Sequence, residues 1–159
     1  MDNAKREQIV GELKKAYAAE LETVQNYLAN SVDLDGVRAE EIKKSLAADI
    51  QEELGHAQML AKRIKVLGGR VPGSMELNRE QSYMQPPQDS TDLITVIKGV
   101  IAAEDSAIEG YERIIRLCNE DDPVTQDLAV TLLGDEQEHR ARHPPAGGAI
   151  GFLVLAIDA

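Results

Sequence analysis

The chain has 159 residues, enough for one domain with a substantial hydrophobic core. Its net charge of −11 argues against nucleic-acid binding, because phosphate contacts need a basic surface. With one cysteine and no apolar leader at the N-terminus, we expect a reducing, cytoplasmic setting. No apolar run reaches the roughly 20 residues that a membrane-spanning helix needs.

Hydrophobic periodicity predicts an all-α protein. The first helix should cover residues 4–32 and the second residues 37–67, with a tight turn at residues 33–36. A turn this short makes the two helices antiparallel neighbours in a bundle. The pair Gly68-Gly69 should end the second helix, because glycine readily adopts the left-handed conformation that closes many helices.

The helical periodicity is lost between residues 70 and 90, where Pro72-Gly73 and Pro86-Pro87 interrupt the chain. A connection of about 20 residues inside a small domain needs a structural reason. A crossover along the length of a helical bundle supplies one. We therefore predict a four-helix bundle with one long crossover between helices two and three, which then run parallel.

The third helix should begin after Ser90 or Thr91, either of which could cap it, and end near Cys118. Asp122 and Pro123 are typical of the cap and first helical position of a fourth helix.

The sequence changes character after His143, where Pro144-Pro145 should end the fourth helix. We therefore divide the chain into a bundle, residues 1–143, and an apolar tail, residues 144–159. The tail could be a short fifth helix at a subunit contact, or it could result from a shifted reading frame.

One pattern of acids and histidines occurs twice along the chain. An acid is followed 32 or 33 residues later by Glu-x-x-His, whose carboxylate and imidazole share one helix face. A lone Glu or His on a helix is usually an ordinary surface or core residue, but all six here fall on inward stripes in matched order. The two copies are Glu20, Glu53 and His56, and Glu104, Glu136 and His139.

Four buried carboxylates need counter-charge, and two divalent ions would supply it. Oxygen-rich ligation with one imidazole per ion suits iron, with manganese also possible, better than structural zinc. Di-iron carboxylate bundles have this same ligand set. By that pattern Glu53 and Glu136 bridge the ions, Glu20 and His56 hold one ion, and Glu104 and His139 hold the other.

Four further residues recur beside the six. Tyr27 and Tyr111 each follow the upstream acid by seven residues, and we predict that they donate hydrogen bonds to ligating carboxylates. Glu52 and Asp135 each precede the acid of a Glu-x-x-His motif. We predict that these two accept the free N–H of an imidazole on the opposite helix and so set its tautomer.

These residues together resemble the ferritin-like superfamily, and most closely a haem-free bacterioferritin-type subunit, over about residues 4–142. The resemblance implies a ferroxidase subunit with two iron ions, which oxidises Fe²⁺ to Fe³⁺ with O₂ or H₂O₂. It also implies assembly into a homo-oligomeric cage for iron storage or detoxification.

Some positions depart from related patterns. Bacterioferritins place their haem-ligating methionine where this chain has Leu54, so haem is not expected. Rubrerythrins usually have a further glutamate at the position of Ile101 and carry a Cys-rich domain that one cysteine cannot build. DNA-protecting miniferritins place their iron sites between subunits with a different motif, although a miniferritin-like shell with an intra-subunit centre remains an alternative.

Two other functions are consistent with the sequence. One is a di-iron or di-manganese oxidoreductase, such as a peroxidase, without storage. The other is a non-enzymatic helical binding module, in which Fe²⁺ or Mn²⁺ would stabilise the fold little.

Overall fold

The computed structural model describes residues 1–142, which form an all-α bundle as predicted. The helices of this region are α1 (Asn3–Asp33), α2 (Ala39–Val66), α3 (Leu93–Cys118) and α4 (Pro123–Arg142). Two single-turn 3₁₀ helices, η1 (Ser74–Glu76) and η2 (Ser82–Met84), lie in the connection between α2 and α3. His143 and the predicted tail, residues 144–159, lie outside the described residues.

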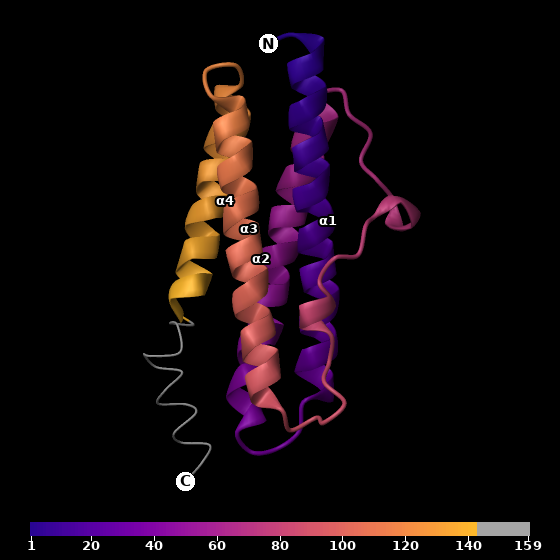
Figure 1. Cartoon of the computed structure of the whole chain (residues 1–159), viewed down its shortest axis with the longest axis vertical. Helices are drawn as coiled ribbons and strands as arrows, with labels where there is room; N and C mark the ends of the chain where they lie inside the picture. Colours follow the sequence, from indigo (N-terminus) through magenta and orange to yellow (C-terminus); the bar gives the residue numbers. More distant parts are fainter. Residues whose placement is uncertain (143–159) are drawn as a thin grey trace.

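The topology is that of a bundle with one long crossover. In Figure 1, α1 starts at the upper end and α2 returns to it, after which the connection descends the bundle. The third helix therefore begins at the lower end and runs parallel to α2, and α4 runs back down beside it. This confirms the predicted crossover. None of the helices within residues 1–142 is long and apolar enough to cross a membrane.

Aspartates cap three of the helices within residues 1–142. Asp2 precedes α1 and accepts the backbone N–H of Lys5 at 2.8 Å. Asp122 precedes α4 and accepts a first-turn backbone N–H at 3.1 Å, as predicted. For α3 the predicted cap was wrong: Asp92 caps the helix and accepts the Thr95 backbone N–H at 3.0 Å. The hydroxyls of Ser90 and Thr91 instead donate hydrogen bonds to aspartates earlier in the chain. The helix therefore begins after Asp92, whose carboxylate accepts a backbone N–H of the first turn.

Two apolar clusters fill the bundle, one toward each end. The first lies toward the α3–α4 turn, and its buried members are Ile9, Leu13, Leu60, Ile64, Leu67, Tyr111, Ile114, Cys118, Ala129 and Leu132. The second lies toward the α1–α2 turn and comprises Tyr27, Leu34, Ala39, Leu46, Met84, Leu93, Val96, Val100 and Ala103. Leu28 of α1 and Met59 of α2 are apolar but lie at the surface, with exposed fractions of 55% and 36%.

The crossover connection is fastened to α1 by buried polar side chains. The carboxylate of Glu22 accepts the backbone N–H groups of Glu80 and Gln81, with oxygen–nitrogen distances of 2.9 to 3.1 Å. Further along the helix, the amide of Asn30 donates to the Met84 carbonyl at 2.9 Å. Charge-assisted and buried hydrogen bonds of this kind hold an irregular segment in one place.

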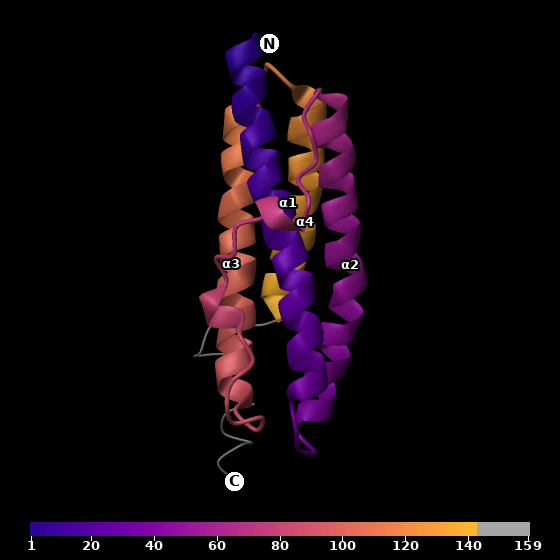
Figure 2. The same cartoon turned by 90° about the vertical axis from the view of Figure 1, so that its right-hand side faces the viewer.

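The same connection packs against α3 at Gly99. A Cβ added at this glycine would lie 2.6 Å from the Tyr83 carbonyl oxygen and 3.0 Å from the Met84 sulfur. Glycine is therefore required for the connection to approach the helix this closely. Figure 2 shows the connection crossing the outer side of α1 to reach α3, so it covers the seam between these two helices.

Candidate metal centre

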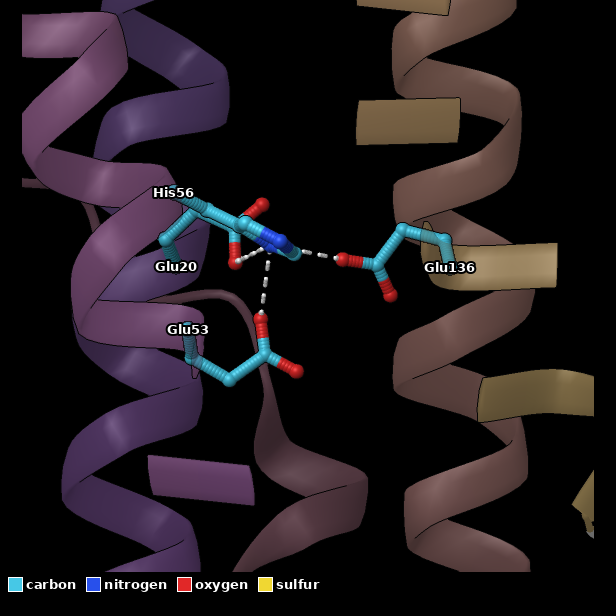
Figure 3. A group of neighbouring side chains, drawn as sticks. All are labelled: Glu20, Glu53, His56 and Glu136. Carbon is cyan, nitrogen blue, oxygen red and sulfur yellow. Dashed lines mark ion pairs between the residues drawn. The ribbon is translucent and has the colours of Figure 1, made fainter. Parts of the chain in front are cut away.

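Three helices bring four of the six predicted ligands together between the two apolar clusters. Glu20 from α1, Glu53 and His56 from α2, and Glu136 from α4 each offer one atom, and these atoms lie within 4.8 Å of one another. The four residues are 2 to 4% exposed. Figure 3 shows the three carboxylates turned toward the His56 ring, whose Nδ1 lies 3.2 Å from Glu136, 3.3 Å from Glu53 and 3.9 Å from Glu20.

The second histidine also faces this group. His139 Nδ1 lies 3.4 Å from Glu53 Oε1 and 3.9 Å from Glu136 Oε2. Each of these two glutamates thus directs one oxygen toward His56 and the other toward His139. The imidazole centroids are 6.3 Å apart. The structure therefore places Glu53 and Glu136 between the two histidines, where bridging ligands would have to lie.

Glu104 of α3, the sixth predicted ligand, is 3% exposed and lies outside the four-residue group. Burial raises the pKa of Glu104 to about 8, with the charge of His139 opposing the rise and that of Glu136 adding to it. The positive charge of Arg140 also lowers this pKa.

The remaining pKa shifts show how the chain balances charge on its own. Burial raises the pKa of Glu20 well above its usual value. Burial alone would lower the pKa of His56, but the neighbouring carboxylates of Glu136, Glu20 and Glu53 raise it to about 12. Protons on these groups compensate the buried carboxylates, and a bound cation would replace those protons.

The outward nitrogens of both imidazoles contact carboxylates from the opposite helix. Asp135 of α4 lies 3.3 Å from Nε2 of His56, and Glu52 of α2 lies 3.0 Å from Nε2 of His139. The Asp135 and Glu52 side chains are 37% and 43% exposed, whereas the imidazoles are almost fully buried.

The two tyrosines occupy different positions. The Tyr111 hydroxyl donates a hydrogen bond to Glu20 Oε1 across the bundle. Tyr27 is 2% exposed, and burial raises its pKa well above the usual value, with the charges of Glu53 and Glu104 adding to the rise. Both phenols are therefore neutral. Tyr111 contacts a buried acid directly, whereas Tyr27 lies close enough for the charges of buried acids to raise its pKa.

Sequence reasoning gave no role to Asp49, although it lies on the inward stripe of α2 one turn before Glu53. It is 8% exposed, and its Oδ1 lies 2.9 Å from Nη1 of Arg142. Its carboxylate, that of Glu52 and the ring of His139 each offer an atom within 4.8 Å of the others. A charge on an apolar stripe was the signal that could have identified it.

This donor set fits a pair of divalent cations. Four carboxylates and two imidazoles are the ligands that iron and manganese accept in helical bundles. His56 Nδ1 and Glu136 Oε1 point into the group and form no hydrogen bond of acceptable geometry. Buried polar atoms without hydrogen bonds are costly, so a cation at this position would remove that cost.

Comparison with known proteins identifies the family. The model of the ferritin-like domain matches residues 10–143, and the chain belongs to this family. Bacterioferritin from Desulfovibrio desulfuricans is 26% identical over 150 residues, which cover 94% of this chain and 79% of that protein. Its solved structure superposes with a TM-score of 0.76 at 25% identity, covering 96% of this chain and 86% of the other.

Two further relatives extend the comparison. DNA protection during starvation protein from Pyrococcus furiosus is 30% identical over 140 residues, covering 85% of this chain and 74% of that protein. The dodecameric thioferritin of Bacteroides fragilis superposes with a TM-score of 0.82 at 23% identity, covering 95% of this chain and 90% of the other. At that identity the second likeness supports the fold alone.

Proposed function

We propose that the chain is a ferroxidase subunit that binds two Fe²⁺ ions and oxidises them to Fe³⁺, with O₂ or H₂O₂ as the electron acceptor. The observation that carries the proposal is the position of Glu53 and Glu136, each with one oxygen toward His56 and the other toward His139. Two cations held by the imidazoles would share both carboxylates.

Within this proposal each ligand has a defined place. Glu20 and His56 would hold one ion, Glu104 and His139 would hold the other, and Glu53 and Glu136 would be shared by both. When bound, the iron pair supplies the electrons, one from each Fe²⁺. The chain itself supplies position, neutralising charge and a site from which helix side chains exclude water.

The contacts at the outward nitrogens determine which imidazole nitrogen is a ligand. The carboxylates of Asp135 and Glu52 lie 3.3 Å from Nε2 of His56 and 3.0 Å from Nε2 of His139, and their charge favours the tautomer that carries its proton at Nε2. That tautomer leaves the Nδ1 lone pairs directed at the centre. Because ligating imidazoles must be neutral and ligating carboxylates ionised, metal uptake should release the protons that the empty site retains.

The proposed assembly and setting are supported by the relatives and not by the site. The thioferritin of Bacteroides fragilis is a dodecamer, and we propose that this chain also forms a homo-oligomeric cage that stores or detoxifies iron. Leu54 at the haem-methionine position supports a haem-free subunit. A cytoplasmic setting is part of the same proposal.

Aerobic addition of Fe²⁺, followed by near-ultraviolet absorbance, tests the proposed chemistry. The parent chain should oxidise iron rapidly, and the double variant Glu53→Ala/His139→Ala should oxidise it no faster than buffer. Glu109→Ala, which removes an exposed carboxylate of α3, is the matched control and should behave as the parent. Equal rates for the parent and the double variant would exclude this site as a ferroxidase centre.

The size of the assembly tests the storage component separately. Light scattering should show a cage, and iron loading should exceed two ions per chain by a large factor. A small oligomer that retains two ions per chain would instead indicate a di-iron oxidoreductase without storage.

A further inference from the structure

The two seams beside the proposed metal centre differ in the residues that cover them. On the α1–α3 seam the crossover connection is fastened by Glu22 and Asn30 and packs closely on Gly99. On the α2–α4 seam the partly exposed carboxylates of Glu52 and Asp135 contact the buried imidazoles directly. Partly exposed carboxylates thus contact both buried imidazoles on the surface between α2 and α4.

An arginine side chain lies on the α2–α4 seam. Arg142, at the end of α4, places its guanidinium against Asp49 of α2, with an Nη1–Oδ1 distance of 2.9 Å. The arginine side chain is 47% exposed and that of Asp49 is 11% exposed. Asp49 in turn lies within ligand distance of Glu52 and His139. The guanidinium of Arg142 thus forms an ion pair with a buried carboxylate beside the proposed centre.

The negative charge of Asp49 affects titratable groups inside the bundle. It contributes to the raised pKa of Glu104 and of Tyr27. Pairing with Arg142 reduces the attraction that Asp49 would exert on a cation, because the two opposite charges largely cancel at a distance. Long-range attraction of this kind governs the rate at which charged ligands reach a cleft.

Given the proposed function, we propose that Fe²⁺ reaches the dinuclear centre along the α2–α4 seam, past Asp49, Glu52 and Asp135, and that Arg142 slows this passage by pairing with Asp49. The arginine touches none of the six ligands, so it acts on access and leaves the capacity of the centre unchanged. The incoming ion competes with the guanidinium for the Asp49 carboxylate.

Stopped-flow mixing of Co²⁺ with the metal-free full chain tests this route without turnover, with visible absorption of the bound ion as the readout. Arg142→Gln should raise the association rate roughly two- to fourfold at low ionic strength, and salt should remove the difference. Arg142→Lys retains the charge and should match the parent. Arg116→Gln removes the same charge from an exposed ion pair on α3 and should also match it.

The amount of Co²⁺ bound at saturation separates the two proposals. If the parent chain binds no Co²⁺, the proposed function and this route both fail. If the parent binds two ions and Arg142→Gln associates no faster than Arg116→Gln, the route alone is wrong. Equal saturation with faster association in Arg142→Gln supports it.

Discussion

The two halves of the proposed metal centre have the same residue types at nearly the same spacing, yet their upstream acids lie in different surroundings. In the first half, Glu20 lies in the tight group with His56 and accepts a hydrogen bond from Tyr111. In the second half, Glu104 lies outside that group, and its pKa of about 8 reflects burial beside His139 and Arg140.

This difference shows that a sequence repeat need not produce equivalent sites. The four ligand atoms of the first group already lie within 4.8 Å of one another, so an ion that binds there needs little rearrangement of side chains. We therefore expect the first half to bind its ion more tightly, and the second half to be filled afterwards.

The largest expected effect comes from neutralising each half separately. Glu20→Gln should weaken binding of the first ion by about 100-fold, because a charged ligand is lost from the tight group. Glu104→Gln should leave the first ion nearly unaffected and weaken the second. Calorimetric titration of the metal-free chain with Mn²⁺ measures both affinities. If Glu104→Gln weakened binding of the first ion as much as Glu20→Gln does, the expected difference between the halves would be contradicted. Glu109→Gln, at an exposed position of α3, is the control.

The outward carboxylates should distinguish the halves less strongly. Asp135→Asn acts on His56 and Glu52→Gln acts on His139, and loss of such a partner typically lowers metal affinity 10- to 100-fold. Asp135→Asn should therefore weaken mainly the first ion, and Glu52→Gln mainly the second. The same titration checks this, and an effect of either variant on both ions alike would contradict the pairing across helices.

A pH series on the metal-free chain examines the second half. Glu104 holds a proton up to a pKa of about 8 in the folded state, against 4.5 ordinarily, so its contribution to stability falls between these values as pH rises. Hydrogen bonds raise the pKa of His139 to about 9 although burial opposes them, so its contribution is present below 6.5 and lost through pH 9. The chain should therefore unfold at a lower temperature at pH 9 than at pH 6.5.

The variant Glu104→Gln tests whether this pH dependence of stability comes from Glu104. Thermal unfolding of Glu104→Gln should show a smaller loss of stability between pH 6.5 and 8 than the parent, while Glu109→Gln should show the full loss. An unchanged slope in Glu104→Gln would mean that the pH dependence comes from elsewhere.

The smallest effect is expected at the tyrosines. Tyr111→Phe removes the hydrogen bond to Glu20, worth about 1 kcal/mol, so the first ion should bind roughly fivefold more weakly. The second ion should be unaffected. Tyr27→Phe, which removes a hydroxyl of the same kind at the repeated position, is the internal comparison. Equal losses for both ions in Tyr111→Phe would contradict the asymmetry between the halves.

Much of this arrangement was predictable because helices have a strict period. Charges at Glu20, Glu53 and Glu136 stand out on apolar stripes, so their burial could be inferred without a structure. The cap of α3 could not be chosen correctly, since Ser90, Thr91 and Asp92 are all good caps and side-chain partners elsewhere decide among them. Leu28 and Met59 are exposed because no neighbouring helix covers their side chains, and periodicity along one helix does not specify which neighbours cover it.

The sequence by itself determined the four-helix architecture, the crossover and the six inward acids and histidines, because local periodicity and the repeated spacing depend only on neighbours along a helix. The tertiary structure decided that Glu104 lies outside the group that contains Glu20, that the connection covers the α1–α3 seam (Figure 2), and that Arg142 pairs with Asp49. These features depend on contacts between residues far apart in the chain, whose distances arise only when the helices pack together.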